Sequence, residues 1–79
     1  MKILIIEDEL ILAKSIQEYL EAEDNMCELA TTFDMALMKS GVYEYDCILV
    51  DITLPGGNGL DIIRQLKKQH SSAGIIRFG

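Results

Sequence analysis

The sequence predicts an α/β fold in which helices cover a parallel sheet. Two runs, Lys2–Ile6 and Cys47–Val50, have the continuous hydrophobicity typical of strands buried on both faces. Segments with helical periodicity lie between the strand-like runs, so strands and helices alternate along the chain. This alternation, βαβαβαβ, favours parallel strands joined by right-handed crossovers.

The first strand is followed by an amphipathic helix. Apolar residues recur on one face at every fourth position, namely Leu12, Ile16 and Leu20, with Leu10 and Ala13 beside them. Asp8 is expected to cap the start of this helix, and the polar cluster 23–25 to end it. The next run, Met26–Ala30, predicts a second strand that is more exposed than the first.

A short second helix is expected after that strand. Thr31–Asp34 has the form of a capping box, in which the acid stands three residues after the first threonine. The helix that follows carries Met35 and Met38, which we interpret as core filler, and is expected to stop at Gly41. The third strand, Cys47–Val50, comes next.

A loop dense in turn residues, 51–59, separates the third strand from a third helix. Asn58 is expected to cap this helix, and His70 to lie solvated at its end. Leu60, Ile63 and Leu66 are expected to point inward, and Arg64, Lys67 and Lys68 outward. Ala73–Phe78 predicts a fourth strand.

Length and composition limit the possible classes of protein. Seventy-nine residues allow one small domain, 1–79, and a 49% share of hydrophobic residues is enough for a packed core. The formal net charge of −6 argues against nucleic-acid binding by this segment, because phosphate binding needs clustered Lys and Arg. The apolar runs are too short for a bilayer span or a signal peptide.

Two cysteines, Cys27 and Cys47, lie in predicted strands without metal-ligand spacing to each other or to His70. Two buried, reduced thiols are expected rather than a disulfide. Reduced thiols fit a cytoplasmic protein.

Acidic residues stand where two predicted strands end. Glu7 and Asp8 follow the first strand, and Asp51 follows the third. Because the carboxyl ends of neighbouring parallel strands share one rim, the three carboxylates are expected to gather there and to attract a hard divalent cation such as Mg²⁺. Each acid taken singly could be a solvated cap, but their joint placement, followed by Thr53 and Pro55, favours the metal site.

Three segments carry a resemblance to a known family: Lys2–Glu9, Tyr45–Asp51 and Thr53–Asp61. They place an acid pair, a lone acid and a Pro/Gly loop in order. In these segments the sequence resembles the receiver domain of bacterial two-component response regulators, and the resemblance spans all but the last three residues. It implies a flavodoxin-like sheet of strand order 2-1-3-4-5, of which an incomplete 2-1-3-4 portion is expected here.

The resemblance also implies roles for individual residues. Asp51 resembles the aspartate that accepts a phosphoryl group from a sensor histidine kinase. Asp8 and Asp51 resemble direct Mg²⁺ ligands, Glu7 the acid that reaches the metal, and the main-chain carbonyl of Thr53 the remaining protein ligand. A cation offsets the repulsion between a carboxylate and an anionic phosphoryl donor. Pro55 and Gly59 are interpreted as structural residues of the turn.

The sequence departs from the family at its end. A Ser or Thr that ends the fourth strand of receivers, and a Lys that ends the fifth, are both expected to lie outside this sequence. Arg77-Phe78-Gly79 is an unusual continuation, and Arg77 in a strand covered on both faces needs a partner. We therefore interpret the chain as a truncated receiver that has lost its switching element and self-associates through an exposed sheet face or edge.

The leading functional hypothesis is a phosphoacceptor module in two-component signal transduction, without substrate turnover. Its parent is expected to carry a DNA-binding output domain, by analogy with the family alone. The first alternative is a Mg²⁺-dependent phosphatase that uses an aspartyl phosphate, although Thr53 stands where such enzymes generally have a second acid. The other alternative is a non-catalytic structural or interaction fragment.

Overall fold

The computed structural model describes residues 1–54, 59–68 and 72–79. Its elements are β1 (Lys2–Ile6), α1 (Leu10–Ala22), β2 (Met26–Ala30), α2 (Phe33–Val42), β3 (Cys47–Asp51), α3 (Gly59–Lys68) and β4 (Gly74–Phe78). The strands pair in parallel in the order β2-β1-β3-β4, which confirms the predicted fold class and strand order. The predictions for Pro55, Asn58 and His70 fall outside the described residues.

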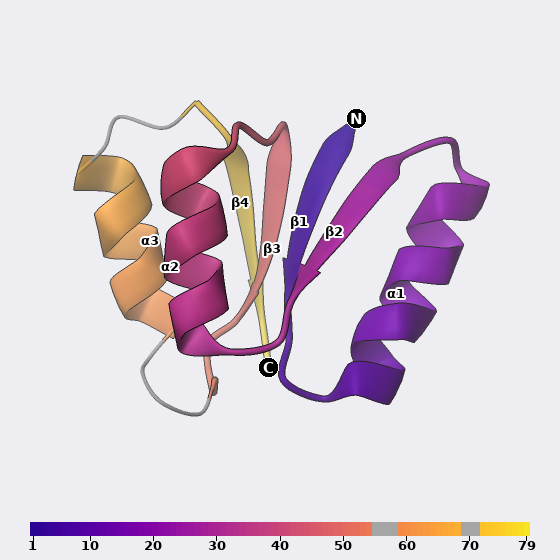
Figure 1. The fold of residues 1–79 in the computed structure, drawn as a ribbon, viewed down its shortest axis with the longest axis horizontal. Helices are drawn as coiled ribbons and strands as arrows, with labels where there is room; N and C mark the ends of the chain where they lie inside the picture. Colours follow the sequence, from indigo (N-terminus) through magenta and orange to yellow (C-terminus); the bar gives the residue numbers. More distant parts are fainter. Residues whose placement is uncertain (55–58, 69–71) are drawn as a thin grey trace.

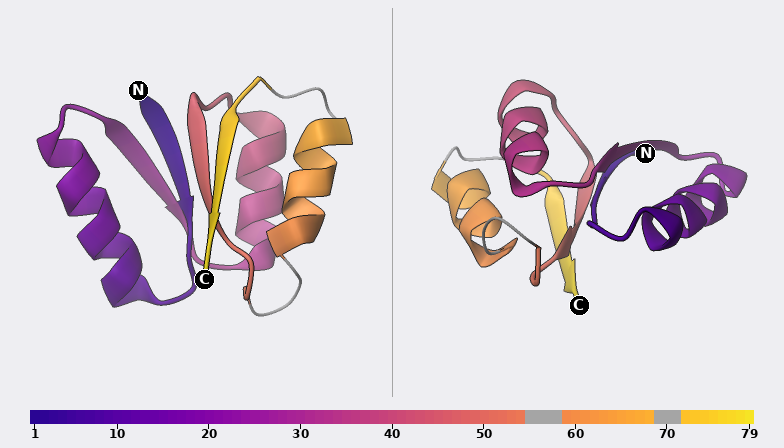
Figure 2. Two further views of the ribbon diagram at one scale, coloured as in Figure 1. Left: turned by 180° about the vertical axis from the view of Figure 1, so that it is seen from behind. Right: turned by 60° about the horizontal axis from the view of Figure 1, so that its bottom comes forward.

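The molecule has three layers (Figure 1). Helices α2 and α3 lie together on one face of the sheet, and α1 lies on the opposite face, as the view from below shows (Figure 2). Right-handed crossovers between parallel strands place successive helices on either face according to the direction in which the next strand is added. Among the described helices, none has the length and hydropathy that a membrane span requires.

The main hydrophobic core lies between the sheet and helices α2 and α3. Its fully buried large side chains include Leu4, Ile6, Ile48, Val50, Ile62 and Leu66. The strand residues alternate along β1 and β3, because successive side chains of a strand point to opposite faces. The inward positions predicted for Ile63 and Leu66 are confirmed, and Ile62 is a further core residue that the periodicity did not single out.

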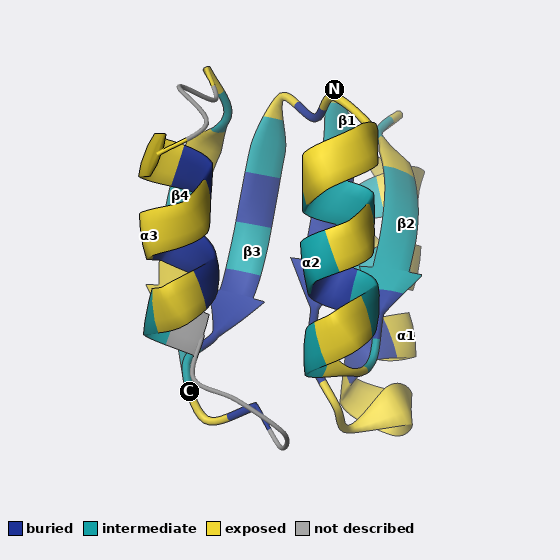
Figure 3. Cartoon of the chain, turned by 60° about the vertical axis from the view of Figure 1, so that its left-hand side comes forward, coloured by how far each residue is buried: buried dark blue, intermediate teal, exposed yellow. Residues whose placement is uncertain are grey.

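The opposite face of the sheet is less well covered. Helix α1 packs mainly on β2 and β1, and most of its residues are exposed; the parts of α1 that remain in view in Figure 3 are mostly yellow, the colour of exposed residues. Of its predicted inward stripe only Ala13 is buried, while Leu12 remains 41% exposed. Ile76 in β4 is 55% exposed on this face. Among the described residues, the apolar stripe of α1 is therefore only partly buried against the sheet.

Helix α1 begins without a side-chain cap and ends in a turn closed by backbone hydrogen bonds. Glu9, not Asp8, is the N-cap residue, and its side chain makes no capping hydrogen bond, so the predicted cap at Asp8 is wrong. The predicted end at residues 23–25 is correct. Asp24 adopts a left-handed φ of 65°, and the N–H groups of Asp24 and Asn25 donate to the carbonyls of Glu21 and Leu20, as in a Schellman motif.

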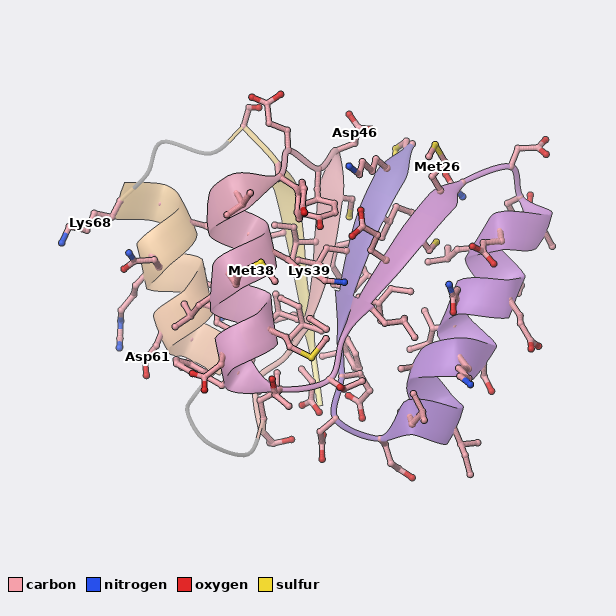
Figure 4. The ribbon with its side chains drawn as sticks, in the orientation of Figure 1. Met26, Met38, Lys39, Asp46, Asp61 and Lys68 are labelled. Carbon is pink, nitrogen blue, oxygen red and sulfur yellow. The ribbon has the colours of Figure 1, made fainter. Side chains whose placement is uncertain are left out.

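Helix α2 begins one residue later than the predicted capping box. Thr32 is its N-cap, and the Thr32 hydroxyl accepts a hydrogen bond of 3.1 Å from the Met35 N–H. The helix continues past Gly41 to Val42. Near its end, Lys39 reaches back toward β2, where its ammonium group donates to the Leu29 carbonyl at 2.9 Å (Figure 4).

Both cysteines are free, as predicted, but they are half-buried rather than buried. Cys27 and Cys47 pair in register with Ile3 from the two strands that flank β1. Two strand spacings of about 4.8 Å separate them, which is beyond the reach of a disulfide.

Arg77 does not need the buried partner that the sequence suggested. It lies in β4 in register with Val50, and its side chain is exposed. With Lys67, Ile63 and Ile75 it lines an open cavity of about 260 Å³ between α3 and β4. The expectation of a partner applied to a buried position, and the open cavity beside α3 leaves the Arg77 side chain exposed.

Candidate functional site

Three acidic side chains meet at the carboxyl rim of the sheet. Glu7 and Asp8 follow β1, and Asp51 is the last residue of the neighbouring strand β3. Each offers one carboxylate oxygen, and the three oxygens lie within 4.8 Å of one another. Asp8 is exposed, whereas Glu7 and Asp51 are only 3% and 4% exposed. The structure thus brings these three predicted site residues together.

The sheet itself fixes this convergence. Ile6 and Val50 are register partners in β1 and β3, so the residues that follow them emerge side by side at the same rim. The N–H of Glu7 also donates to the Ala30 carbonyl of β2 at 3.1 Å. The backbone on both sides of the acid cluster is therefore held by the hydrogen bonds of the sheet.

Thr53 holds the carboxylate of Asp51 from one side. Its N–H and its hydroxyl both donate to Asp51 Oδ1, at 2.9 Å and 2.7 Å. Such donors stabilise an ionised carboxylate, because hydrogen bonds to a charged acceptor are the strongest of their kind. The sequence placed Thr53 at the site through its main-chain carbonyl alone, so the side-chain contact is a functional feature that sequence reasoning missed.

Gly79 also lies close to the carboxylate of Asp51. It follows β4 with a φ of 107°, and a Cβ atom at this position would overlap Asp51 Oδ1. The Ile52 N–H donates to the Phe78 carbonyl at 3.0 Å, which fixes the end of β4 beside the site. The structure places Gly79, the residue after β4, beside the acid site, which the sequence did not indicate. The register of β4 with β3 was the missing information.

Glu7 lacks a complete set of hydrogen-bond partners. Its Oε1 accepts from the Glu9 N–H at 3.3 Å, but its Oε2 is buried without a donor. A buried carboxylate oxygen in this state is unfavourable beside a second carboxylate. The pair therefore needs a proton or a cation between Glu7 and Asp51.

In the absence of a cation, the proton resides on Glu7. Burial raises the pKa of Glu7 to about 7, and its hydrogen bond with Asp51 and the charges of Asp51 and Asp8 act in the same direction. Burial also acts to raise the pKa of Asp51, but hydrogen bonds from the protonated Glu7 and from Thr53 outweigh it and lower that pKa below its usual 3.8. Asp51 is thus the ionised member of the pair.

The residues present fit a small divalent cation. Carboxylate oxygens are the ligands that Mg²⁺ prefers, and it is usually held by one or two carboxylates with several waters. The unpartnered Oε2 of Glu7 and the exposed Asp8 provide ligand atoms beside the ionised Asp51. The site can therefore hold a cation next to the ionised carboxylate of Asp51, and this carboxylate is available as a nucleophile.

Comparisons with known proteins point to one family. The sequence model of the response regulator receiver domain family matches residues 3–78. Among curated relatives, the chain is 41% identical to the aerobic respiration control protein ArcA of Escherichia coli over 79 residues, covering 98% of the chain and 32% of ArcA. It is 33% identical to the two-component response regulator PhoP of Pseudomonas aeruginosa over 76 residues, covering 96% of the chain and 34% of PhoP.

Solved structures show the same fold. A receiver domain protein from Methanospirillum hungatei superposes with a TM-score of 0.92 at 28% identity, over 96% of this chain and 61% of that one. The response regulator TrrA of Thermotoga maritima, solved in complex with Mg²⁺-BeF, superposes with a TM-score of 0.88 at 30% identity, over 94% of this chain and 64% of that one.

The chain spans about a third of the length of the curated relatives that it matches. Within that span the fold, the strand order and the family match agree. The chain belongs to the response regulator receiver domain family of two-component systems.

Proposed function

We propose that this chain is a phosphoacceptor module in which Asp51 receives a phosphoryl group from a sensor histidine kinase. One observation carries the proposal: the ligand oxygens of Glu7, Asp8 and Asp51 converge within 4.8 Å at the carboxyl rim of a receiver fold. Asp51 is the central member, because it is buried, ionised and held by Thr53.

Magnesium is the proposed cofactor. Asp8 and Asp51 are its proposed direct ligands, Glu7 reaches it from the buried side, and the Thr53 carbonyl completes the protein ligands. The ion supplies positive charge where a carboxylate meets an anionic phosphoryl donor. The chain's own contribution is to fix the three acids through the register of β1 and β3, so that little reorganisation is needed when the donor arrives.

A phosphatase with turnover has weaker support. Such an enzyme needs a second acid two residues beyond its nucleophile, and the side chain there is Thr53, which donates its hydroxyl proton toward Asp51. We therefore propose a phosphoacceptor rather than an enzyme. An output domain that binds DNA is proposed for the parent by analogy with the family, in which relatives such as ResD of Bacillus subtilis are named transcriptional regulatory proteins.

A second partner is proposed to be another copy of this chain. Ile76 is 55% exposed on the thinly covered face of the sheet, and Leu49 beside it is only half-buried. Exposed apolar strands at a sheet edge tend to pair with other chains. The free thiols agree with a reducing compartment, and we propose a cytoplasmic location.

The primary test is phosphorylation with a small donor. The chain is incubated with acetyl phosphate and Mg²⁺, and intact-mass analysis follows the gain of one phosphoryl group. We expect the gain in the wild type and in Asp61→Asn, whose carboxylate lies on the exposed side of α3 and pairs with Arg64. We expect none in Asp51→Asn. Equal gain in both variants would rule out Asp51 as the acceptor, and no gain in any of them would overturn the proposed function.

A further inference from the structure

The open cavity between α3 and β4 has a mixed lining. Ile63 and Lys67 of α3 form one wall, and Ile75 and Arg77 of β4 form the other, where the two elements lie next to each other (Figure 3). The two α3 residues are one helical turn apart, and the two β4 residues point to the same face of their strand. Each wall therefore presents an isoleucine and a cation about 6 Å apart. Such a lining suits a molecule that has an apolar part and a negative charge.

The positive charge at this cavity is not balanced by acids of the chain. The sequence as a whole has a formal net charge of −6, but residues 59–79 reverse the balance: their single acid, Asp61, stands against Arg64, Lys67, Lys68 and Arg77. Asp61 pairs with Arg64 at 2.8 Å. Among the residues that the structure describes, neither Lys67 nor Arg77 has an ion pair with a carboxylate. An anion between these two cations would offset their mutual repulsion.

Two cations elsewhere in the fold are neutralised by an acid. Lys2 and Lys39 both lie beside Glu28, at 3.5 Å and 3.6 Å. In a chain of negative net charge, an anion in solution is repelled from most of the surface and is attracted to a place where unpaired cations gather. The α3–β4 cavity is such a place, and it combines this attraction with apolar surface.

We propose that the α3–β4 cavity binds a small amphipathic carboxylate. Its apolar tail lies between Ile63 and Ile75, and its carboxylate head lies at Lys67 and Arg77. Ile75 is half-buried, so the tail covers apolar surface that water otherwise contacts. The site shares no residue with the acid cluster at the carboxyl rim, and binding there needs neither a metal ion nor a phosphoryl group.

The size of the cavity sets the size of the ligand. A volume of about 260 Å³ corresponds to roughly nine water molecules at their liquid volume, and so to a ligand of about eight non-hydrogen atoms. A carboxylate head leaves about five of these atoms for a tail that contacts both isoleucines. A phosphate head, with its phosphorus and four oxygens, would leave only about three. The volume therefore favours a carboxylate, and hexanoate is a suitable probe.

The test is a titration of the 79-residue chain with sodium hexanoate at constant ionic strength, followed by the NMR signals of the isoleucine methyl groups. We expect the signals of Ile63 and Ile75 to shift and saturate with a Kd on the order of 1–10 mM. Ile76 is the internal control, because it neighbours Ile75 in β4 but points to the opposite face of the sheet, and its signal should stay unchanged.

Two matched ligands separate the contributions of head and tail. Hexanol has the same tail without the charge and should bind about tenfold more weakly than hexanoate, because it makes no ion pair with either cation. Acetate has the head without the tail and should not saturate the methyl shifts over the same concentration range. A wild-type chain that binds hexanoate no more tightly than hexanol would overturn the proposal.

Variants of the two cations test the head group. Lys67→Met and Arg77→Met remove the charge but keep an apolar stem, and each should weaken hexanoate binding about threefold, while the double variant weakens it about tenfold. Hexanol binding should not change in either variant. Lys68→Met is the matched control, because Lys68 is adjacent in α3 but is not a lining residue, and Figure 4 shows it pointing away from the sheet.

Two further results would contradict this site. If Lys68→Met weakened hexanoate binding as much as Lys67→Met, the effect would come from the general charge of α3 rather than from the cavity. If Ile76 shifted as much as Ile75, hexanoate would bind without preference for this face. The titration contains neither acetyl phosphate nor Mg²⁺, so its outcome is independent of the proposed role of Asp51.

Discussion

The two faces of the sheet are built from the same strands but differ in how completely they are covered. On the face of α2 and α3, Ile48 is 1% exposed within a continuous core. On the face of α1, one helix covers mainly β2 and β1, and Ile76 of the edge strand remains largely exposed. Glu7 and Asp51 follow Ile5 and Leu49 by two residues, so they share the thinly covered face.

The densely covered face stabilises the fold, whereas the thinly covered face carries the candidate site. Burying an ionised group costs free energy unless it is paired, so a site that must open to a cation and a phosphoryl donor is best placed at the edge of the thinner layer. The dense face supplies the hydrophobic stabilisation that holds the strand register, and the register in turn holds the acids together.

The largest effect is expected when an isoleucine on each face of the sheet is replaced by alanine and the two variants are compared. Ile48→Ala should lower the free energy of unfolding by about 2–4 kcal/mol, because it leaves a cavity in the dense core. Ile76→Ala should lower it by less than about 1 kcal/mol, because that side chain is already largely in water. Urea titrations of both variants measure the contrast, and equal losses would show that the two faces contribute alike.

The next effect concerns the acids on the thinner face. With burial raising the pKa of Glu7 from 4.5 to about 7, the folded chain keeps a proton that the unfolded chain releases between these values. The free energy of unfolding of the metal-free chain should therefore fall as the pH rises through this window. Glu7→Gln should abolish the fall and stabilise the chain at pH 8 by on the order of 2 kcal/mol. Thermal denaturation in EDTA from pH 5 to pH 8 measures it.

The same proton governs metal binding. Mg²⁺ needs the ionised form of Glu7, so its affinity should rise as the pH increases from 6 to 8. Calorimetric titration measures the affinity at each pH, with Glu18→Gln as a control carboxylate on the exposed side of α1. An affinity that stays constant over this range would show that Glu7 is not protonated in the metal-free site.

The helix starts provide a smaller contrast between the two layers. Thr32→Ala removes the hydroxyl that caps α2 and should cost about 1 kcal/mol of folding free energy. Glu9→Ala at the start of α1 should have an effect near zero, because the Glu9 side chain makes no capping bond. Chemical denaturation of the two variants tests this. If Glu9→Ala lost more folding free energy than Thr32→Ala, the Glu9 side chain would stabilise the start of α1, contrary to this prediction.

The last effect concerns association rather than folding, and it is expected from Ile76→Lys, which places a charge on the exposed part of β4. Its consequence should appear in association: sedimentation at micromolar concentration should show self-association of the wild type and a monomer for this variant. Ser15→Lys, on the exposed side of α1, is the control. A wild type that is already monomeric would contradict the proposed contact between copies.

Local sequence determined much of this protein. The apolar runs around Leu4 and Ile48 fixed two strands, the polar residues around Asp24 ended α1, and the order of Glu7, Asp8 and Asp51 after strands indicated a shared site. These features depend on side-chain periodicity and backbone preference within a few residues, and such preferences can be recognised without the fold.

Only the tertiary structure decided the rest. The register of β4 on β3 placed Gly79 against Asp51, and the turn after β3 brought the Thr53 hydroxyl onto Oδ1. The position of β4 at the end of the strand order left Ile76 exposed on the face of α1 and Arg77 exposed beside the open cavity on the face of α3. Burial and hydrogen bonding at these positions depend on which distant segments of the chain lie side by side. The sequence pattern within one segment does not reveal which segments will be its neighbours in the fold.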